Sequence, residues 1–495
     1  MFTEYMDALS LVFQFKTIIA IAFGTALGLL MGALPGLTAA MAIALLLPLT
    51  FGMPPVMGIG MLLGILCGAI SGGSIPAALL NIPGTPSSVA TTLDAFPMTR
   101  NGQAGRALGI AIVSSFIGGV FSAIVLSLLA PPIAMFALKF GPAEYFTLSV
   151  FGLVIITSIA KTLVKGLIAG LIGLLLAMVG ADPIEGVQRF TFGQPSLMSG
   201  INLLPALIGL FAVSQVIEDA VAYLGKGQVR LEKQLFDKAI PRWREVISSW
   251  KILLSSSSIG VVVGAIPGAG GSIASFLAYD QAKKMSKTPE KFGTGHPEGI
   301  IASESSNNAL TGGSLIPMLT LGVPGEAATA VLLGGLMIQG IQPGPTLFAE
   351  QGPVIYGLFI AFFIANIFML LFQWVGIGFF VKVLNMPRKL LMALILVFCV
   401  LGVYAVDNDI FNIYLMIGFG VLGYFLNRFG FGTAPVILGL ILGPIAEANL
   451  RRALLLSEGS WFTFLERPIS LAFLVLAGIC VVYSLNHKYK NRVIS

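Results

Sequence analysis

The chain has 495 residues, of which 56% are hydrophobic and only 10% are charged. An ordinary soluble domain carries about 25% charged residues, so this composition excludes a cytosolic enzyme, a nucleic-acid binder and a disordered scaffold. Long apolar stretches recur to the end of the chain, which indicates an all-α polytopic membrane protein. The chain also contains 59 Gly and 27 Pro, and this excess predicts that many apolar helices are interrupted.

Apolar stretches long enough to cross a bilayer need roughly 20 residues. In chain order the candidates are 12–33, 107–135, 144–160, 163–181, 201–224, 353–384, 389–406, 410–426, 433–447 and 468–486. Other apolar stretches contain Gly, Pro, Ser, Thr and Asn in place of Leu and Val, and these are 37–50, 56–71, 74–93, 252–279 and 308–340. We therefore expect about 10 to 14 transmembrane helices, some of them broken or folded into re-entrant hairpins.

A basic linker at 225–251 divides the chain almost in half and contains more Lys and Arg than Asp and Glu. The positive-inside rule places this linker in the cytoplasm, and the basic tail at 487–495 is expected on the same side. The predicted domains are a first membrane repeat at 1–224 and a second repeat with additional C-terminal helices at 252–486. The N-terminus lacks a basic leader segment, so the first apolar stretch is expected to be a retained helix.

The two halves contain an internal repeat. Three motifs recur in the same order: 28–36 as 260–268, 69–76 as 309–317 with one inserted residue, and 82–84 as 323–325. A single Gly-rich motif is weak evidence, but three ordered matches indicate duplication.

The loops of the two halves differ in charge. The loop after the first motif carries Lys283, Lys284, Lys287 and Lys291 in the second half, whereas 51–55 in the first half has no charge. After the third motif the bias is reversed, because Arg100 and Arg106 follow it in the first half and 339–351 has no Lys or Arg. Opposite charge in equivalent loops predicts two inverted repeats.

Interrupted helices predict the chemistry of a binding site. Half-helix N-termini favour anions such as carboxylates, exposed carbonyl groups favour Na⁺, and neutral hydroxyl and amide groups add hydrogen bonds. We expect helix breaks near 35, 72–88, 267 and 303–329, with the Pro-Gly pairs setting the breaks. The residues predicted to bind the substrate are Pro35, Gly36, Gly72, Gly73, Ser74, Asn81, Pro83, Gly84, Thr85, Ser87, Ser88, Pro267, Gly268, Gly270, Gly271, Asn307, Asn308, Gly312, Gly313, Ser314, Pro324, Gly325 and Thr329. The candidate cation contacts are Ser71, Thr311 and Thr320. The alternative for these small residues is close helix packing alone.

Neither a metal centre nor a cofactor is expected. Cys67, Cys399 and Cys480 lie far apart in apolar stretches and are interpreted as buried hydrophobic residues, while both His residues lie in polar segments. A membrane-embedded hydrolase would need Asp94 and Asp280 to converge, so we do not expect an enzyme. A channel is the other alternative.

Several stretches together resemble one known family. They are 35–52, 71–76, 81–86, 267–271 and 297–309, and the likeness extends over most of the chain, to about residue 440. They resemble the large membrane subunit, TctA, of the tripartite tricarboxylate transporters.

The resemblance implies a multi-pass permease of the bacterial inner membrane with two partners, a small membrane subunit and a periplasmic solute-binding protein. It implies import of organic carboxylates such as citrate and other di- and tricarboxylates, coupled to a Na⁺ or H⁺ gradient. The sequence has no Walker-type Gly-Lys-Ser/Thr loop, which agrees with transport that does not use ATP. A stand-alone transporter, antiporter or exporter of small anions, without a binding protein, is the alternative.

Overall fold

A computed structural model describes residues 2–157, 162–182, 185–225, 240, 242–268, 270–383 and 388–493. In this part of the chain the only strands are β1 (Gly180–Ala181) and β2 (Gln188–Arg189), which form an antiparallel pair. Eight of the described helices are long and apolar enough to cross a membrane, and five shorter apolar helices accompany them. The prediction of an all-α polytopic membrane protein is confirmed.

The chain forms two compact units, each built from two segments of sequence. Unit 1 comprises Met1–Ala134 and Asp219–Phe398, and unit 2 comprises Met135–Glu218 and Cys399–Ser495. The two units are defined by which residues pack together, whereas the boundary predicted at 225–251 separates two copies of a duplicated sequence. The division into units therefore does not test the repeat boundaries, which stay a prediction. Lys226, Arg230, Lys233 and Lys238 of the linker lie outside the described residues.

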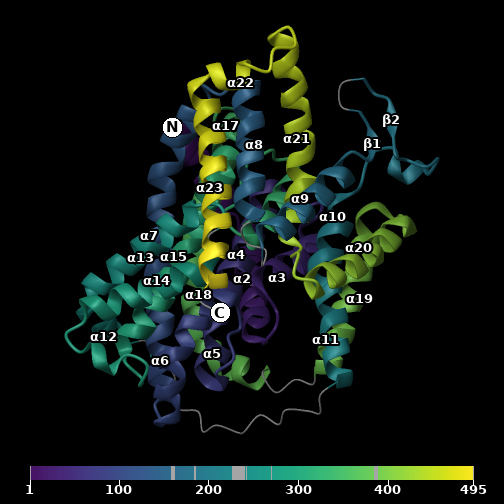
Figure 1. Ribbon diagram of the computed structural model, residues 1–495. Coiled ribbons are helices and arrows are strands. Elements are labelled where there is room, and N and C mark those ends of the chain that lie inside the picture. The colour runs from purple at the N-terminus through teal and green to yellow at the C-terminus, as the bar shows by residue number, and fades with distance from the viewer. Residues whose placement is uncertain are drawn as a thin grey trace. The chain divides into compact units, whose positions relative to one another are not determined.

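Unit 1 contains both copies of the repeated motifs. Its elements are α1 (Phe2–Val12), α2 (Phe15–Ala33), α3 (Ala39–Leu46), η1 (Leu47–Thr50), α4 (Pro55–Gly72), α5 (Ser74–Leu80), η2 (Pro86–Ser88), α6 (Val89–Arg100), most of α7 (Ala104–Ala137), α12 (Trp243–Ser248), α13 (Trp250–Ala265), α14 (Gly270–Met285), η5 (Pro289–Lys291), α15 (Pro297–Leu321), α16 (Ala327–Ile338), α17 (Pro345–Glu350) and α18 (Gly352–Val383) (Figure 1).

Unit 2 is also helical. Its elements are α8 (Pro142–Thr157), α9 (Leu163–Ala177), β1, β2, η3 (Pro195–Leu197), α10 (Leu203–Leu207), the π-helical η4 (Ile208–Val213), α20 (Ile410–Arg428), α21 (Ala434–Leu456), α22 (Thr463–Glu466) and α23 (Pro468–Val493). Two further helices, α11 (Ser214–Gly225) and α19 (Arg388–Asp407), continue from one unit into the other. The β1–β2 hairpin is attached to α21 by Arg189, whose two Nη atoms donate to Glu447 at 2.8 and 3.1 Å. These hydrogen bonds raise the pKa of the Arg189 guanidinium.

The repeat is visible in how the helices of unit 1 pack. Gly28 of α2 lies so close to α4 that a Cβ would meet the carbonyl oxygen of Ile65, and Gly260 of α13 meets the carbonyl oxygen of Ser306 in α15 in the same way. The helix pairs α2–α4 and α13–α15 are therefore equivalent. Both pairs use small residues to bring two backbones together, as membrane helices commonly do.

The glycine contacts also fix the alignment of the second motif. Gly72 of α4 faces the carbonyl oxygen of Leu29, and its counterpart facing Val261 is Gly313. The predicted alignment paired Gly72 with Gly312 and needed an inserted residue, and it is wrong by one position. A Gly-Gly pair offers two equally good matches to a sequence comparison, whereas only one of the two glycines can face the neighbouring backbone.

Helices break at the Pro-Gly pairs. The residues that follow α2 and α13, Leu34 and Ile266, are extended, and the glycines two positions later, Gly36 and Gly268, have φ values of +96° and +82°. Such left-handed backbone favours glycine. At the second break, α5 and α15 both end on left-handed residues, Asn81 and Gly322.

The Gly-Gly pairs, in contrast, do not break the backbone. Gly73 keeps right-handed helical angles, and α4 with α5 forms one candidate span, Pro55–Leu80. Helix α15 continues through Gly312 and Gly313 to Leu321. The breaks within the expected ranges 72–88 and 303–329 therefore fall at 81–85 and 322–326.

The two repeats exchange contacts. Helix α3 of the first repeat packs against α16 of the second, and α14 of the second packs against η2 and α6 of the first. This exchange is typical of a pseudo-two-fold relation. Figure 1 shows α5 and α6 toward the lower end of unit 1 and α17 toward the upper end, which agrees with inverted repeats. The orientation of the repeats to the membrane stays a prediction.

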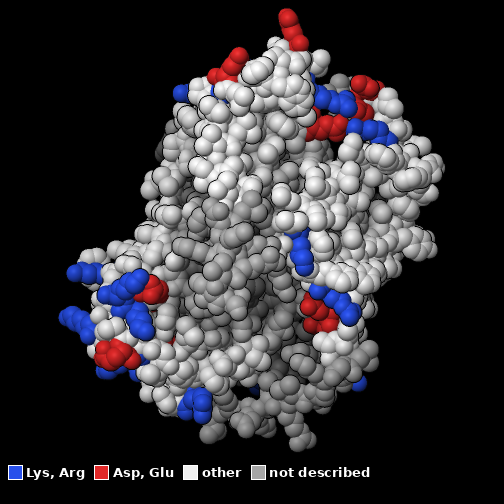
Figure 2. Space-filling view, in the orientation of Figure 1, with Lys and Arg blue, Asp and Glu red and all other residues white. Residues whose placement is uncertain are grey.

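Four basic side chains of unit 1 lie at the end of α14 and in the loop after it. Lys283, Lys284, Lys287 and Lys291 are exposed on α14 and the loop that follows it, and Figure 2 shows blue side chains over the end that carries α12 and α14. The predicted basic loop is therefore on the surface.

Candidate functional site

Residues of the first break meet the start of α14 from the other repeat. The hydroxyls of Thr85 and Ser87 lie 3.1 Å apart, and those of Thr85 and Ser88 lie 2.8 Å apart. Ser275 of α14 donates from its hydroxyl to the carbonyl oxygen of Ser87 at 2.8 Å, and Gly271 packs on the Ser87 side chain. We call this group, Thr85, Ser87, Ser88, Gly271 and Ser275, the junction. The structure thus brings five neighbouring residues of both repeats together, four of them predicted.

The second break repeats this geometry in detail. The backbone N–H of Thr85 donates to the Ser88 hydroxyl at 3.2 Å, and that of Glu326 donates to the Thr329 hydroxyl at 3.0 Å. Both are capping boxes that start a helix after a Pro-Gly turn. The Gly268 N–H donates to the Gly325 carbonyl oxygen at 2.8 Å, so the two second-half breaks also touch.

Asn307 is buried on the face of α15 that runs between these breaks. Residues four and seven apart share a helix face, so Asn307 lies on the same face as Ser303 and Ser314. The Thr91 hydroxyl, from α6, lies 3.2 Å from that of Ser303, and Ser314 packs on Gly325. Both amide atoms of Asn307 are buried without a hydrogen-bond partner in the described residues. Buried amide groups are almost always paired, so these two atoms mark a place where a ligand or water would bind.

Several predicted residues have a packing role in the structure. Gly72, Gly84, Gly313 and Gly325 each sit against the backbone of α2 or α13, and Gly312 packs on Ser122 of α7. Gly73 packs on Thr85 and Ser88. The remaining predicted backbone residues, Pro35, Gly36, Asn81, Pro83, Pro267, Gly268, Gly270 and Pro324, lie in the turns that form the four breaks or, for Gly270, begin α14. Whether any of them binds substrate stays a prediction.

Ser71 and Ser74 are held by a residue that the sequence did not single out. The Ser71 hydroxyl donates to Gln373 Oε1 at 2.7 Å, and Gln373 Nε2 donates to the Ser74 hydroxyl at 3.2 Å. Gln373 lies on α18, some three hundred residues away in sequence, and is fully buried. The hydroxyl of Thr320 donates to a carbonyl oxygen of its own helix. The Ser314 hydroxyl donates to the backbone carbonyl oxygen of Thr311. Their role as cation contacts stays a prediction.

The two repeats differ in polarity in the middle of α4 and α15. Because Ile65 corresponds to Ser306, residues 62–67 of α4, Leu-Leu-Gly-Ile-Leu-Cys, correspond to 303–308 of α15, Ser-Glu-Ser-Ser-Asn-Asn. All twelve positions are buried. The same helix is thus built once with apolar residues and once with polar ones, so the polar residues are not needed to form the fold. A polar run that the fold does not need is a candidate for function.

Glu304 lies in this polar run, and the sequence prediction left it out. Its Oε1 accepts from Thr91 at 2.5 Å and its Oε2 accepts from Ser115 at 2.9 Å. Asn308, which was predicted, donates from Nδ2 to the Glu304 carbonyl oxygen at 3.0 Å. The signal available in the sequence was a carboxylate within a stretch otherwise free of charge.

Asp94 fastens the charged loop of the second repeat to α6. Its Oδ1 accepts from the backbone N–H groups of Gly293, Gly295 and His296 at 2.7 to 2.9 Å, and its Oδ2 accepts from the Tyr279 hydroxyl at 2.8 Å. Asp280 is exposed and pairs with Lys284. The two aspartates considered for a hydrolase therefore have separate partners. Cys67 and Cys399 are buried, as predicted, and Cys480 is half-buried.

Broken apolar helices in two related halves, with buried polar groups between the breaks, define a polytopic membrane transporter. The comparison with protein families is specific: the model of the tripartite tricarboxylate transporter TctA family matches residues 18–438. The chain belongs to this family and is a large subunit of such a transporter.

Two relatives from Agrobacterium vitis support this assignment. The "Uncharacterized 52.8 kDa protein in TAR-I ttuC' 3'region" is 38% identical over 467 residues, which are 93% of this chain and 92% of the relative. The "Uncharacterized protein in TAR-II ttuC' 3'region" is 38% identical over 226 residues, which are 46% of this chain and 93% of that relative. No solved structure matches the chain.

Proposed function

We propose that this protein is the permease subunit that imports citrate-like tricarboxylates or dicarboxylates, coupled to a Na⁺ or H⁺ gradient. It works in the bacterial inner membrane with a small membrane subunit and a periplasmic binding protein that delivers the substrate. The C-terminal tail and the basic linker are on the cytoplasmic side. The single observation that best supports a binding site here is the unpartnered amide of Asn307 on the face of α15 between the breaks.

The chemistry of this region suits a carboxylate. Helices η2 and α16 begin after the Pro-Gly turns, so the positive ends of helix dipoles lie at the breaks. The hydroxyls of the junction and the amide of Asn307 add neutral donors. Together these groups can bind several carboxylate oxygens without burying a fixed positive charge beside them.

The test is uptake of radiolabelled citrate, succinate and malate into proteoliposomes that contain the full-length chain and its two proposed partners. We expect saturable uptake that requires an imposed Na⁺ or H⁺ gradient. Absence of uptake of all three carboxylates would overturn the proposal. Uptake that does not need the binding protein would instead support a stand-alone transporter.

Asn307→Leu tests the site, because Leu66 is the natural residue at the equivalent position of the first repeat. Losing one neutral hydrogen-bonding side chain in a binding site costs about 1–3 kcal/mol, which raises the KM for the carboxylate roughly 5- to 150-fold. The matched control is Asn101→Ala, at an exposed asparagine after α6. Equal KM values for the two variants would remove Asn307 from the site.

A further inference from the structure

Glu304 is a carboxylate buried in the middle of a membrane-protein helix. It is fully buried in the 25-residue helix α15 and is surrounded by hydrogen-bond donors from three helices. Thr91 of α6 lies 2.5 Å from Oε1, Ser115 of α7 lies 2.9 Å from Oε2, and Asn308 Nδ2 lies 3.5 Å from Oε2. An ionisable group is costly to bury at such a position, and buried ionisable groups in membrane helices usually have a function and a specific partner.

The partner is not a basic side chain of the described residues. Charged and titratable groups on the elements packed around α15 are bonded elsewhere: Asp94 to Tyr279, Arg106 to Glu245, Asp280 to Lys284, and His296 to Thr288. Arg100, Arg244, Lys251 and Lys283 are exposed, and Glu298, Glu326 and Glu350 are acidic. A buried carboxylate without a cationic neighbour is most easily held with a proton.

The fold does not require a carboxylate at this position. The equivalent of Glu304 in the first repeat is Leu63, and the equivalent of Thr91 in the second is Leu332. Both leucines are fully buried. The polar pair Thr91–Glu304 therefore replaces an apolar pair that supports the same architecture.

The hydroxyl groups beside Glu304 can serve both protonation states. Thr91 has one hydroxyl hydrogen but two acceptors in reach, Glu304 Oε1 and, at 3.2 Å, Ser303 Oγ. When Glu304 is ionised, Thr91 donates to it. When Glu304 carries a proton, Glu304 donates to Thr91, Thr91 donates to Ser303, and Ser303 donates to the Gly299 carbonyl oxygen at 2.9 Å. Every hydroxyl hydrogen in this chain of hydrogen bonds therefore has an acceptor whether Glu304 is ionised or protonated.

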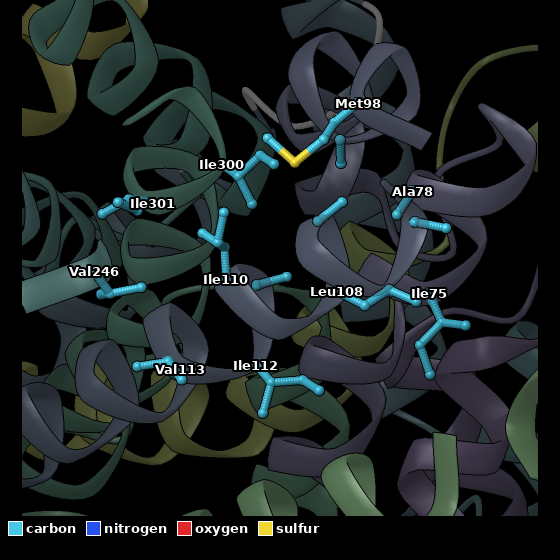
Figure 3. Packing of buried hydrophobic residues seen from close by; sticks show 14 of the residues in the cluster. Ile75, Ala78, Met98, Leu108, Ile110, Ile112, Val113, Val246, Ile300 and Ile301 are labelled. Carbon is cyan, nitrogen blue, oxygen red and sulfur yellow. The ribbon is translucent and has the colours of Figure 1, made fainter. Parts of the chain in front are cut away.

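Thr91 Oγ1 and Glu304 Oε1 lie within direct hydrogen-bond distance, 2.5 Å apart, so a proton can be held between them. On neighbouring turns of the same three helices, Ile300 and Ile301 belong to one apolar cluster with Ile110, Val113 and Met98 (Figure 3). This apolar cluster separates Glu304 from water on that side.

We propose, on the basis of the proposed function, that Glu304 binds the proton whose gradient drives carboxylate uptake. The carboxylate gains one proton on the side from which the substrate enters and loses it on the side to which the substrate is released. Thr91 and Ser115 are positioning residues that hold the carboxyl in both states.

The test compares two activities of Glu304→Gln in proteoliposomes that contain the full-length chain and its proposed partners, with radiolabelled citrate as the probe. Glutamine keeps the size and hydrogen-bonding capacity of the side chain but cannot titrate. We expect exchange of internal for external citrate to stay within about 3-fold of wild type, while accumulation driven by a proton gradient is lost. Glu350→Gln, the same change at an exposed carboxylate, is the control and retains both activities.

The outcomes separate the two proposals. If the wild type transports none of the carboxylates tested, the proposed function fails, and this inference fails with it. If wild-type citrate uptake responds only to a Na⁺ gradient, or if Glu304→Gln still accumulates citrate under a proton gradient, this inference alone fails.

A second variant keeps the proposal testable if Glu304→Gln does not fold. Thr91→Val retains the carboxyl but removes its hydrogen bond with Thr91, which is stronger when the carboxyl is ionised. The pH of half-maximal citrate uptake should rise by about one unit. A purely structural role for Thr91 would lower the amount of active protein without moving this pH, and an unchanged pH would overturn the proposal.

Discussion

The packing of α2 on α4 gives a sharp prediction for Gly28→Ala. The Ala Cβ would lie 2.8 Å from Ile65 Cα and closer still to the carbonyl oxygen of Ile65, and real Cβ atoms essentially never come within 3.0 Å of such atoms. The obstacle is backbone, which cannot rotate away as a side chain can. The two helices must therefore separate by about 1 Å, and a gap of this size forfeits a quarter to a half of each dispersion contact.

The expected cost is about 1–3 kcal/mol, the usual range for overpacking a well-filled core. Alanine is also a better helix former than glycine by roughly 0.5–1 kcal/mol, and this gain offsets part of the loss. Gly378 of α18 isolates the second effect, because a Cβ there meets open space. Gly260→Ala perturbs the equivalent contact of the second repeat and should resemble Gly28→Ala.

Thermal unfolding of the purified full-length protein in detergent measures these changes. We expect the unfolding midpoint to fall by a few degrees for Gly28→Ala and Gly260→Ala, and to stay the same or rise for Gly378→Ala. If Gly28→Ala and Gly378→Ala gave the same midpoint, the close approach of α2 and α4 would be refuted.

Three further predictions concern topology and surface structure. Single cysteines introduced as Met53→Cys and Met285→Cys should react with an impermeant reagent from opposite sides of the membrane, and labelling from one side would contradict inverted repeats. Asp94→Asn weakens the acceptor for three backbone N–H groups and should destabilise the protein by about 1–3 kcal/mol, so an unchanged unfolding midpoint would argue against this attachment. Arg189→Gln should speed proteolysis between β1 and β2, because the hydrogen bonds to Glu447 hold this hairpin on α21, and unchanged cleavage would mean that other contacts hold it.

The sequence was sufficient to predict the membrane class, the family and the positions of the breaks at Pro35–Gly36 and Pro267–Gly268. These features depend on local composition and on residues such as glycine that alone tolerate a left-handed turn. The partners of the polar residues could not be predicted. Gln373 forms a hydrogen bond with Ser71, and Thr91 forms one with Glu304, only because helices that are distant in the chain pack together.

The role of the Gly-Gly pairs could not be predicted from the sequence either. Glycine serves equally for a turn and for close helix packing, and local sequence does not distinguish the two. In the structure, Gly72 and Gly313 face the backbones of α2 and α13 within continuous helices, whereas the Pro-Gly pairs form the turns. The excess of glycine thus has two separate causes, and only the Pro-Gly turns interrupt helices.

The corrected alignment changes what the duplication means for function. With Gly72 paired to Gly313, every glycine that brings the backbones of α2 and α4 together has a small residue at its counterpart in α13 or α15, as Gly28 has in Gly260. The residues that differ are those at the centre of α4 and α15, where buried leucines are replaced by Glu304 and Asn307. Duplication preserved the small residues that the two helices need in order to pack, and at the centre of α4 and α15 the copies differ in groups that this packing does not need. This asymmetry, more than the shared motifs, separates the residues that we propose to bind substrate or a proton from the residues that pack the helices together.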